Sequence, residues 1–158
     1  MALAISLAST PLFAGGFALN EQSISSMGTG YAGRSSSADD ASTVFGNPAG
    51  MARIKQNEVS IGATYLDAKS NIKDASSSQG GVDNPGTNKG DMVPGIAVPM
   101  GYLVTPIDEH WAFGLGVYAP FGLVTDYEHS FQGNGFGNKS KIEVLTVQPT
   151  VSYAFNDK

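Results

Sequence analysis

Four stretches of this sequence alternate large apolar residues with small or polar ones at a period of two. In the first, Val59, Ile61 and Tyr65 alternate with Ser60 and Thr64. The pattern recurs along the chain, and the four stretches are residues 57–69, 93–105, 111–127 and 141–155. A period of two is typical of strands with one apolar face. These runs exceed the ~5–6 residues of an ordinary strand and fit tilted membrane strands of ~9–11 residues. The chain is therefore predicted to be all-β.

The connections between these stretches alternate in length. Segments 70–92 and 128–140 are long and rich in Gly, Asn and other small polar residues, whereas 106–109 is a tight turn. Outer-membrane barrels have long external loops, short periplasmic turns and aromatic girdles. Tyr102 and Trp111 flank the short turn, where a girdle is expected. We therefore predict a transmembrane antiparallel β-barrel whose small, uncharged face lines the interior. A soluble β-sandwich also alternates and is the alternative.

The start of the chain has the pattern of an export signal. Residues 2–12 form an apolar run, and small residues follow at 14–16. An apolar core ahead of small residues is typical of a secretory signal peptide, although the usual positive start is missing. We expect residues 1–14 to be a signal peptide, and the sequence does not establish where this signal begins. A short buried helix or strand is the alternative. No run in the sequence reaches the ~20 apolar residues of a transmembrane helix.

Four strands cannot close a barrel, because two sheet edges would stay unpaired in lipid. We therefore expect residues 54–158 to be the first four strands of a longer barrel, an incomplete barrel with two long extracellular loops. Residues 15–53 do not alternate and are rich in Ser, Gly, Ala and Asp. Such a segment would order poorly alone but could fold inside a lumen.

The composition and isolated motifs argue against several other functions. A formal net charge of −5 offers no basic patch for nucleic acid, and the absence of cysteine excludes a thiolate metal site or nucleophile. Two Gly-rich runs, 28–33 and 114–119, match the dinucleotide pattern, but neither lies between a strand and a helix. His110 and His129 have no metal-ligand spacing and form no catalytic set. We predict no enzyme activity, no metal and no cofactor.

A set of motifs follows in a fixed order along most of the chain. They are GFALNEQS at 16–23, GTGYAG at 28–33, ADDAS at 38–42, NPAGM at 47–51, PFGLVTDY at 120–127 and VQPTVSY at 147–153. In this order they resemble the N-terminal portion of the FadL/TodX (OMPP1) family of outer-membrane long-chain fatty-acid and hydrocarbon transporters. The resemblance implies a monomeric fourteen-stranded barrel of the bacterial outer membrane, with residues 15–53 as a hatch that plugs it. It also implies that hydrophobic molecules bind inside the barrel and leave sideways into membrane lipid.

Two candidate sites lie in the predicted hatch. Proline fixes its own φ and extends the residue before it, so Asn47-Pro48 makes a defined bend, and Ala49 leaves room for close approach to the wall. A plain turn into the first strand is the alternative, whereas the resemblance implies a gating role for these three residues. For Phe17 the resemblance implies an aromatic that reaches into the ligand pocket. An aromatic that only anchors the terminus is the alternative.

The third candidate site interrupts the third strand at Pro120, Phe121 and Gly122. Proline removes a backbone donor and glycine contributes no side chain, so both belong at bulges, bends or edges. An ordinary bulge near the rim is the alternative, whereas the resemblance implies a lateral opening in the wall.

The expected function is uptake of hydrophobic compounds, most of all long-chain fatty acids, with aromatic hydrocarbons as the other plausible cargo. A non-transporting surface barrel, such as an adhesin or phage receptor, is the alternative. A simple surface barrel needs neither a hatch nor a break in its wall. The motifs at 47–49 and 120–122 therefore favour the channel.

Overall fold

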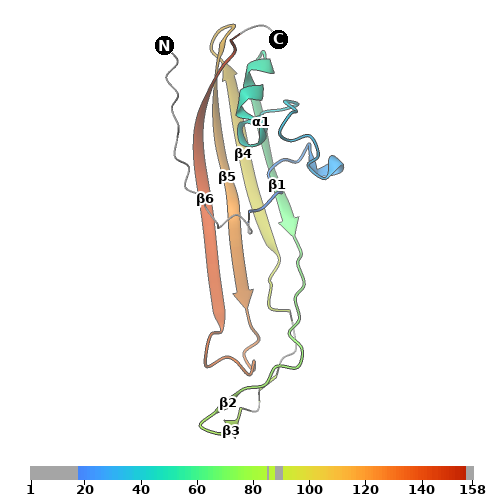
Figure 1. The fold of residues 1–158 in the computed structure, drawn as a ribbon, viewed down its shortest axis with the longest axis vertical. Coiled ribbons are helices and arrows are strands. Elements are labelled where there is room, and N and C mark those ends of the chain that lie inside the picture. Colours follow the sequence, from blue (N-terminus) through green and yellow to red (C-terminus); the bar gives the residue numbers. More distant parts are fainter. Residues whose placement is uncertain (1–17, 85, 88–90, 156–158) are drawn as a thin grey trace, which may run out of the picture.

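Four long antiparallel strands form one sheet in the order β1-β4-β5-β6 (Figure 1). The computed structural model describes residues 18–84, 86–87 and 91–155. The long strands are β1 (Glu58–Leu66), β4 (Ile96–Pro106), β5 (Trp111–Asp126) and β6 (Lys139–Tyr153). All four predicted strands are confirmed to within a few residues at their ends. Among the described residues, no helix combines the length and the apolar character needed to cross a membrane.

The loops follow the predicted asymmetry. A turn of four residues joins β4 to β5, whereas a long excursion joins β1 to β4 and contains a small hairpin of β2 (Ser78–Gln79) and β3 (Val82–Asp83). Asp108 shapes the short turn, because its Oδ1 accepts hydrogen bonds from the backbone N–H groups of His110 (2.8 Å) and Trp111 (2.7 Å). The sheet therefore has a turn end and a loop end.

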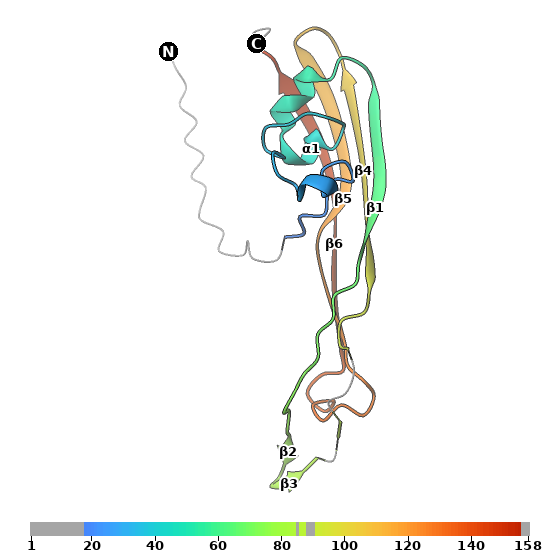
Figure 2. The ribbon, with the colours of Figure 1, turned by 90° about the vertical axis from the view of Figure 1, so that its right-hand side faces the viewer.

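Residues 18–53, here termed the N-terminal segment, pack on one face of the sheet (Figure 2). The segment contains three short helices, which are η2 (Met27–Thr29), α1 (Thr43–Gly46) and η3 (Pro48–Arg53). The helices α1 and η3 lie over the half of the sheet near the turn end, and the loop half extends beyond them. The predicted signal peptide 1–14 and Phe17 lie outside the described residues.

The strand register defines which residues share a face, because directly paired residues of antiparallel strands project to the same side. Ser60 pairs with Tyr102, Tyr102 with Gly116, and Gly116 with Gln148, and this face carries the N-terminal segment. The prediction that a small, uncharged face lines the interior holds for most of β1 and of the turn half of β5, with Glu58 and Tyr118 as exceptions, but it is wrong for β4. There the large side chains face inward, and they are Val98, Met100, Tyr102 and Val104, all buried.

The reason for this reversal is the segment that β4 must cover. Val44 and Met51 of the N-terminal segment are fully buried, and they belong to one core cluster with Met100 and Val104. Burying a side chain of this size stabilises a fold by about 1.5–3 kcal/mol. The apolar side chains of β4 therefore face inward, where they cover Val44 and Met51 of the segment.

Glycine on β5 makes the close approach of the segment possible. A Cβ at Gly114 would overlap the Sδ atom of Met51 and would lie 2.8 Å from Cγ2 of Val44. On the neighbouring level, Tyr118 packs edge-on against Phe45 with ring centroids 4.9 Å apart. The missing side chain of Gly114 thus leaves the space that Met51 and Val44 of the segment occupy.

Candidate functional site

The wall of strands is interrupted between β4 and β5. Their ladder runs from Pro106↔Ala112 to Met100↔Tyr118, whereas β4 extends back to Ile96 and β5 extends on to Asp126. The end of β5 and the segment before β4 are joined again where the Asp126 N–H donates to the Met92 carbonyl at 2.8 Å. The stretch between the Met100–Tyr118 pair and the Asp126–Met92 bond is termed the window below.

Two prolines and a bulge account for the position of the window. Pro120 lies on β5 and Pro99 on β4, and neither can donate a backbone hydrogen bond to a continuing ladder. The register between β5 and β6 shifts by one residue here, so that Ala119 and Pro120 stand opposite Leu145 alone. Sequence reasoning found Pro120 but missed Pro99, which lies in a stretch of otherwise regular alternation.

The bulge also reverses the faces of β5. Before it, the even-numbered Gly116 and Tyr118 face inward, whereas beyond it Phe121 pairs with Val144 and the odd-numbered residues face inward. Gly122 consequently projects outward, paired with Glu143. The three predicted residues Pro120, Phe121 and Gly122 therefore present different faces of the wall within one short stretch.

An apolar cavity of about 380 Å³ occupies the window. This volume lies within the ~300–1,000 Å³ range of small-molecule sites. Its lining comes from both faces of the sheet and from the N-terminal segment: Leu19, Leu66, Ile96, Ala97, Val98, Pro99, Ala119, Phe121, Gly122, Glu143, Val144 and Leu145. By register, Val98 and Phe121 face inward, whereas Pro99 and Leu145 face outward. The cavity is therefore bordered by residues from both faces of the sheet.

Gly122 leaves room at the outer side of this cavity. A Cβ added there would meet nothing closer than the backbone oxygen of Ile142, at 3.9 Å. This contrasts with Gly114, where a Cβ would overlap the packed segment. A side chain at residue 122 can therefore enter the window without a steric clash at its base.

The rim of the window carries paired charges. Lys141 Nζ lies 2.8 Å from Glu143 Oε1, and Lys139 Nζ lies 2.6 Å from Asp126 Oδ2. All four side chains are about half exposed, so each pair contributes little to stability. Among the described residues, Glu143 is the one carboxylate that lines the cavity, and Lys141 offsets its charge.

Two residues of the N-terminal segment bond directly to the bulge. The Leu19 N–H donates to the Pro120 carbonyl at 2.9 Å, and Gln22 Nε2 donates to the Ala119 carbonyl at 2.7 Å. Sequence reasoning missed the contribution of Gln22, although the residue lies within the motif at 16–23. No local signal could have found it, because its partner is 97 residues away.

Asn47-Pro48-Ala49 lies at the junction of α1 and η3, over the turn half of the sheet (Figure 2). Asn47 has φ −153° and ψ 77° and joins α1 to η3, and Pro48 opens the second of these helices. Thr43 Oγ1 donates to the Asn47 carbonyl at 2.8 Å, so the bend is braced from within the segment. Ala49 is exposed, and Met51 makes the close contact with β5. The structure therefore does not bring this motif to the window.

A hydroxyl network supports the segment on its polar side. Ser42 Oγ donates to Ser23 Oγ at 3.0 Å, and the Ser42 N–H donates to Asp40 Oδ1 at 2.8 Å. Burial raises the pKa of Asp40, but hydrogen bonds from Ser25 and Ser42 outweigh it and leave this pKa below its ordinary value. Asp40 is therefore an ionised acceptor at neutral pH.

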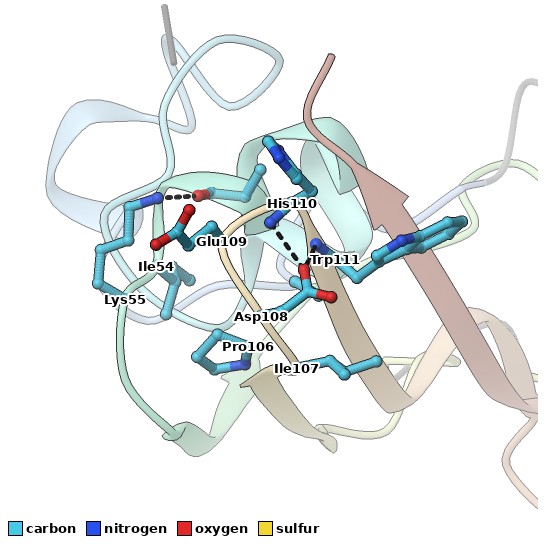
Figure 3. A pocket seen from close by; sticks show the side chains of 10 residues that line it. Ile54, Lys55, Pro106, Ile107, Asp108, Glu109, His110 and Trp111 are labelled. Carbon is cyan, nitrogen blue, oxygen red and sulfur yellow. Dashed lines mark hydrogen bonds between the residues drawn. The ribbon is translucent and has the colours of Figure 1, made fainter. Parts of the chain in front are cut away.

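A cavity of about 700 Å³ lies at the turn end of the sheet (Figure 3). Its lining includes Lys55, Asp108, Glu109 and His110 beside Trp111, and Figure 3 shows the Asp108 carboxylate directed at the turn backbone. Backbone N–H groups of Trp111 and His110 hold the pKa of Asp108 below its ordinary value. So many charges do not suit a hydrophobic ligand, and the smaller cavity in the window is the better candidate. Across the described ranges, no group of three or more His, Asp and Glu side chains could hold a metal ion.

The sequence and the fold of the chain have counterparts in known proteins. A family model described as outer membrane protein transport protein (OMPP1/FadL/TodX) matches residues 5–158. The chain belongs to this family. Its strands accordingly form part of an outer-membrane β-barrel, and the resemblance drawn from the sequence is confirmed.

Related FadL-family sequences agree along almost the whole chain. It is 30% identical over 157 residues to a long-chain fatty acid transport protein of Salmonella typhi, covering 99% of this chain and 35% of that protein. It is 31% identical over 163 residues to outer membrane protein P1 of Haemophilus influenzae, covering 97% and 36%. The 47 kDa outer membrane protein of Pasteurella multocida is 33% identical over 145 residues, covering 92% and 32%. The chain spans about a third of the length of these relatives.

A solved FadL-family structure has the same fold. The crystal structure of a Pseudomonas aeruginosa FadL homologue superposes with a TM-score of 0.66 at 26% identity, covering 89% of this chain and 35% of that chain. The expected location in the bacterial outer membrane agrees with the family description and with the names of the relatives.

Proposed function

We propose that the protein takes up hydrophobic small molecules, long-chain fatty acids above all, and releases them sideways through the window between β4 and β5. The observation that carries the proposal is the apolar cavity that touches both faces of the sheet at the bulge. The names of several relatives, long-chain fatty acid transport proteins, support the choice of cargo. In this proposal the barrel works as a monomer, and membrane lipid receives the ligand.

The thermodynamic drive for sideways release is transfer of the acyl chain into lipid. Each CH₂ group removed from water contributes about 0.8 kcal/mol. A ligand in a lumen lined by Ser60, Thr150 and Gln148 keeps polar neighbours, whereas the window leads past Val98, Phe121 and Leu145. The apolar lining offers an acyl chain a continuous path from the lumen to the bilayer.

Residues 15–53 act in this proposal as the hatch that controls access to the lumen. Asn47, Pro48 and Ala49 form the bend at which the hatch adjusts, since Asn47, with φ −153° and ψ 77°, joins two short helices. Phe17 is proposed to contact ligand just ahead of the part that bonds to the wall. Leu19 and Gln22 support this arrangement, because they tie the same stretch to Pro120 and Ala119.

Blocking the window tests the proposal. In the complete protein that carries this chain, Gly122→Phe or Gly122→Arg should fill the cavity from its open side, whereas Gly101→Phe places the same aromatic on the outer face of the continuous wall. A Cβ meets no heavy atom within 4 Å at Gly101 and none closer than 3.9 Å at Gly122. The measurement is uptake of a labelled long-chain fatty acid in cells that lack their own transporter, with ligand binding and heat-modifiability as checks on the fold.

We expect Gly122→Phe to abolish most uptake while binding and folding persist, and Gly101→Phe to transport normally. A folded Gly122→Phe protein that transports at the wild-type rate would show that ligand leaves elsewhere. Equal loss in both variants would show that any bulky residue on the outer face impairs the protein, and would also contradict the window as the route.

A further inference from the structure

The bulge in β5 presents two backbone acceptors to the N-terminal segment. Ala119 and Pro120 stand opposite a single residue of β6, and the ladder to β4 has already ended at Tyr118. Both carbonyl groups instead accept hydrogen bonds from the N-terminal segment, one from Gln22 Nε2 at 2.7 Å and one from the Leu19 N–H at 2.9 Å. An unpaired buried carbonyl is costly, so these two bonds stabilise the bulged form of the strand.

Gln22 is also attached to the strand on the other side of the window. Tyr102 Oη donates to the Gln22 carbonyl at 2.9 Å, and Tyr102 lies on β4 two residues from the last pair of the β4–β5 ladder. Gln22 has 0% exposure and Tyr102 has 3%. One buried residue thus contacts β4 through its backbone and β5 through its side chain, at the edge where the two strands part.

The side chain of Gln22 is held by one bond in the described structure. Its Oε1 atom is buried and has no hydrogen-bond partner among the described residues, so the bond to Ala119 alone fixes the amide. If that bond is lost, the Ala119 carbonyl loses its partner in the segment, and the bulge is held by the Leu19 N–H to Pro120 bond alone.

We propose that Gln22 is a positioning residue of the window, which it holds open by drawing the bulge of β5 inward and away from β4. The inference rests on the proposed function, because it concerns the route by which ligand leaves. It adds a direct mechanical link, since any displacement of residues 19–22 must move the two carbonyl groups at the edge of the window.

The test separates this role from a general contribution to folding. Gln22→Leu keeps the approximate size but cannot donate to Ala119, and Gln22→Asn keeps the amide on a shorter side chain. Gln148→Leu is the matched control, because Gln148 Nε2 also ties the segment to the wall, through the Val44 carbonyl at 3.0 Å, but at α1 and not at the bulge. Its Oε1 accepts from Tyr118 Oη, so this control also loses a contact next to the window but keeps both bonds to the bulge. The chain contains no cysteine, so no thiol within it competes with introduced labelling sites.

Labels at Ala63→Cys and Lys141→Cys of the complete protein lie on β1 and β6, on either side of the window, and their distance reports its width. Fatty-acid uptake is measured in the same Gln22 variants without the labels, because Lys141 is paired with Glu143 at the rim. We expect both Gln22 variants to shorten this distance and to lower fatty-acid uptake about two- to tenfold, the effect of one hydrogen bond on a two-state equilibrium. Gln148→Leu should leave the distance unchanged. Should Gln22→Leu fail to fold, Gln22→Asn decides the question.

An unchanged distance in a folded Gln22 variant would overturn the inference, even if Gly122→Phe blocks uptake and the proposed route stands. The same shift in Gln148→Leu would overturn it too, because the effect would then belong to the whole segment. A shortened distance with normal uptake would support the positioning role and would contradict the window as the exit.

Discussion

The turn half and the loop half of the sheet are built from the same strands but differ in what stabilises them. In the turn half, β1, β4, β5 and β6 form continuous ladders, and the N-terminal segment buries Met100, Tyr102 and Val104. In the loop half, β4 and β5 separate, and the large inward-facing side chains of β5 and β6 remain exposed, as at Leu123 (42%) and its partner Ile142 (46%).

This difference indicates that the two halves of one sheet have different roles: the turn half carries the N-terminal segment and the loop half contains the window. Backbone pairing and apolar burial together make the turn half rigid. Loss of the pairing would leave polar backbone groups without partners, and loss of the packed segment would expose apolar side chains. The loop half lacks both over the window. An opening in a barrel wall can form there without weakening the part that carries the N-terminal segment.

The largest effect is expected from the core of the turn half. Met51→Ala removes a fully buried side chain and should lower the free energy of unfolding by about 2–5 kcal/mol. Leu123→Ala, on the loop half, should cost well under half as much because Leu123 is already 42% exposed. Thermal unfolding of the complete protein in detergent measures both. Similar losses at the two sites would contradict the contrast between the halves.

A smaller loss of stability is expected when a side chain at residue 114 fills the space that Met51 and Val44 occupy. Gly114→Val would place a side chain on Met51 and Val44, and such overpacking costs about 1–3 kcal/mol. Gly101→Val is the control on the outer face, where a Cβ meets no heavy atom within 4 Å. Limited proteolysis should cut within residues 18–53 faster in Gly114→Val alone. Equal protection of both variants would mean that the segment is not held at Gly114.

A modest effect on transport is expected at the rim of the window. Lys141→Ala leaves Glu143 without its partner beside the cavity, so it should slow the passage of an anionic fatty acid more than that of a neutral hydrocarbon. Because exposed ion pairs contribute only about 0.2–1 kcal/mol, the selective loss should be at most about fivefold. Glu143→Gln with Lys141→Ala should restore the rate. Equal slowing of both cargoes would exclude a role for charge.

The smallest effect concerns pH and the polar side of the segment. The pKa of Asp40 lies below its ordinary value of 3.8 in the folded protein, so its ionised form stabilises the fold above that value. This contribution is lost only as the pH falls below 3.8 and through the lower, folded pKa. Protease sensitivity of residues 18–53 should therefore differ between wild type and Asp40→Asn at pH 7, and converge in strong acid. A difference in protease sensitivity that grows as the pH falls would contradict the prediction, because protonation of Asp40 should make the two proteins alike.

Much of this fold follows from the sequence alone. The four strands, the short turn at 106–109 and the two long loops are local features, because a period of two and the turn residues are visible in any short stretch. The break at Pro120 was also predictable, since a missing backbone donor does not depend on the surroundings. The family resemblance likewise rested on local motifs, and the match over residues 5–158 confirms it.

Tertiary structure decided which faces meet and which distant residues join. Alternation gives the two faces of β4 but not their direction, and β4 turns Met100 and Tyr102 inward because Val44 and Met51 need an apolar cover. The register shift at Ala119 likewise depends on pairing with β6. The bonds from Gln22 to Ala119 and from Tyr102 to Gln22 span 97 and 80 residues. No local pattern encodes such contacts, because they arise only when the segment and the sheet bury each other.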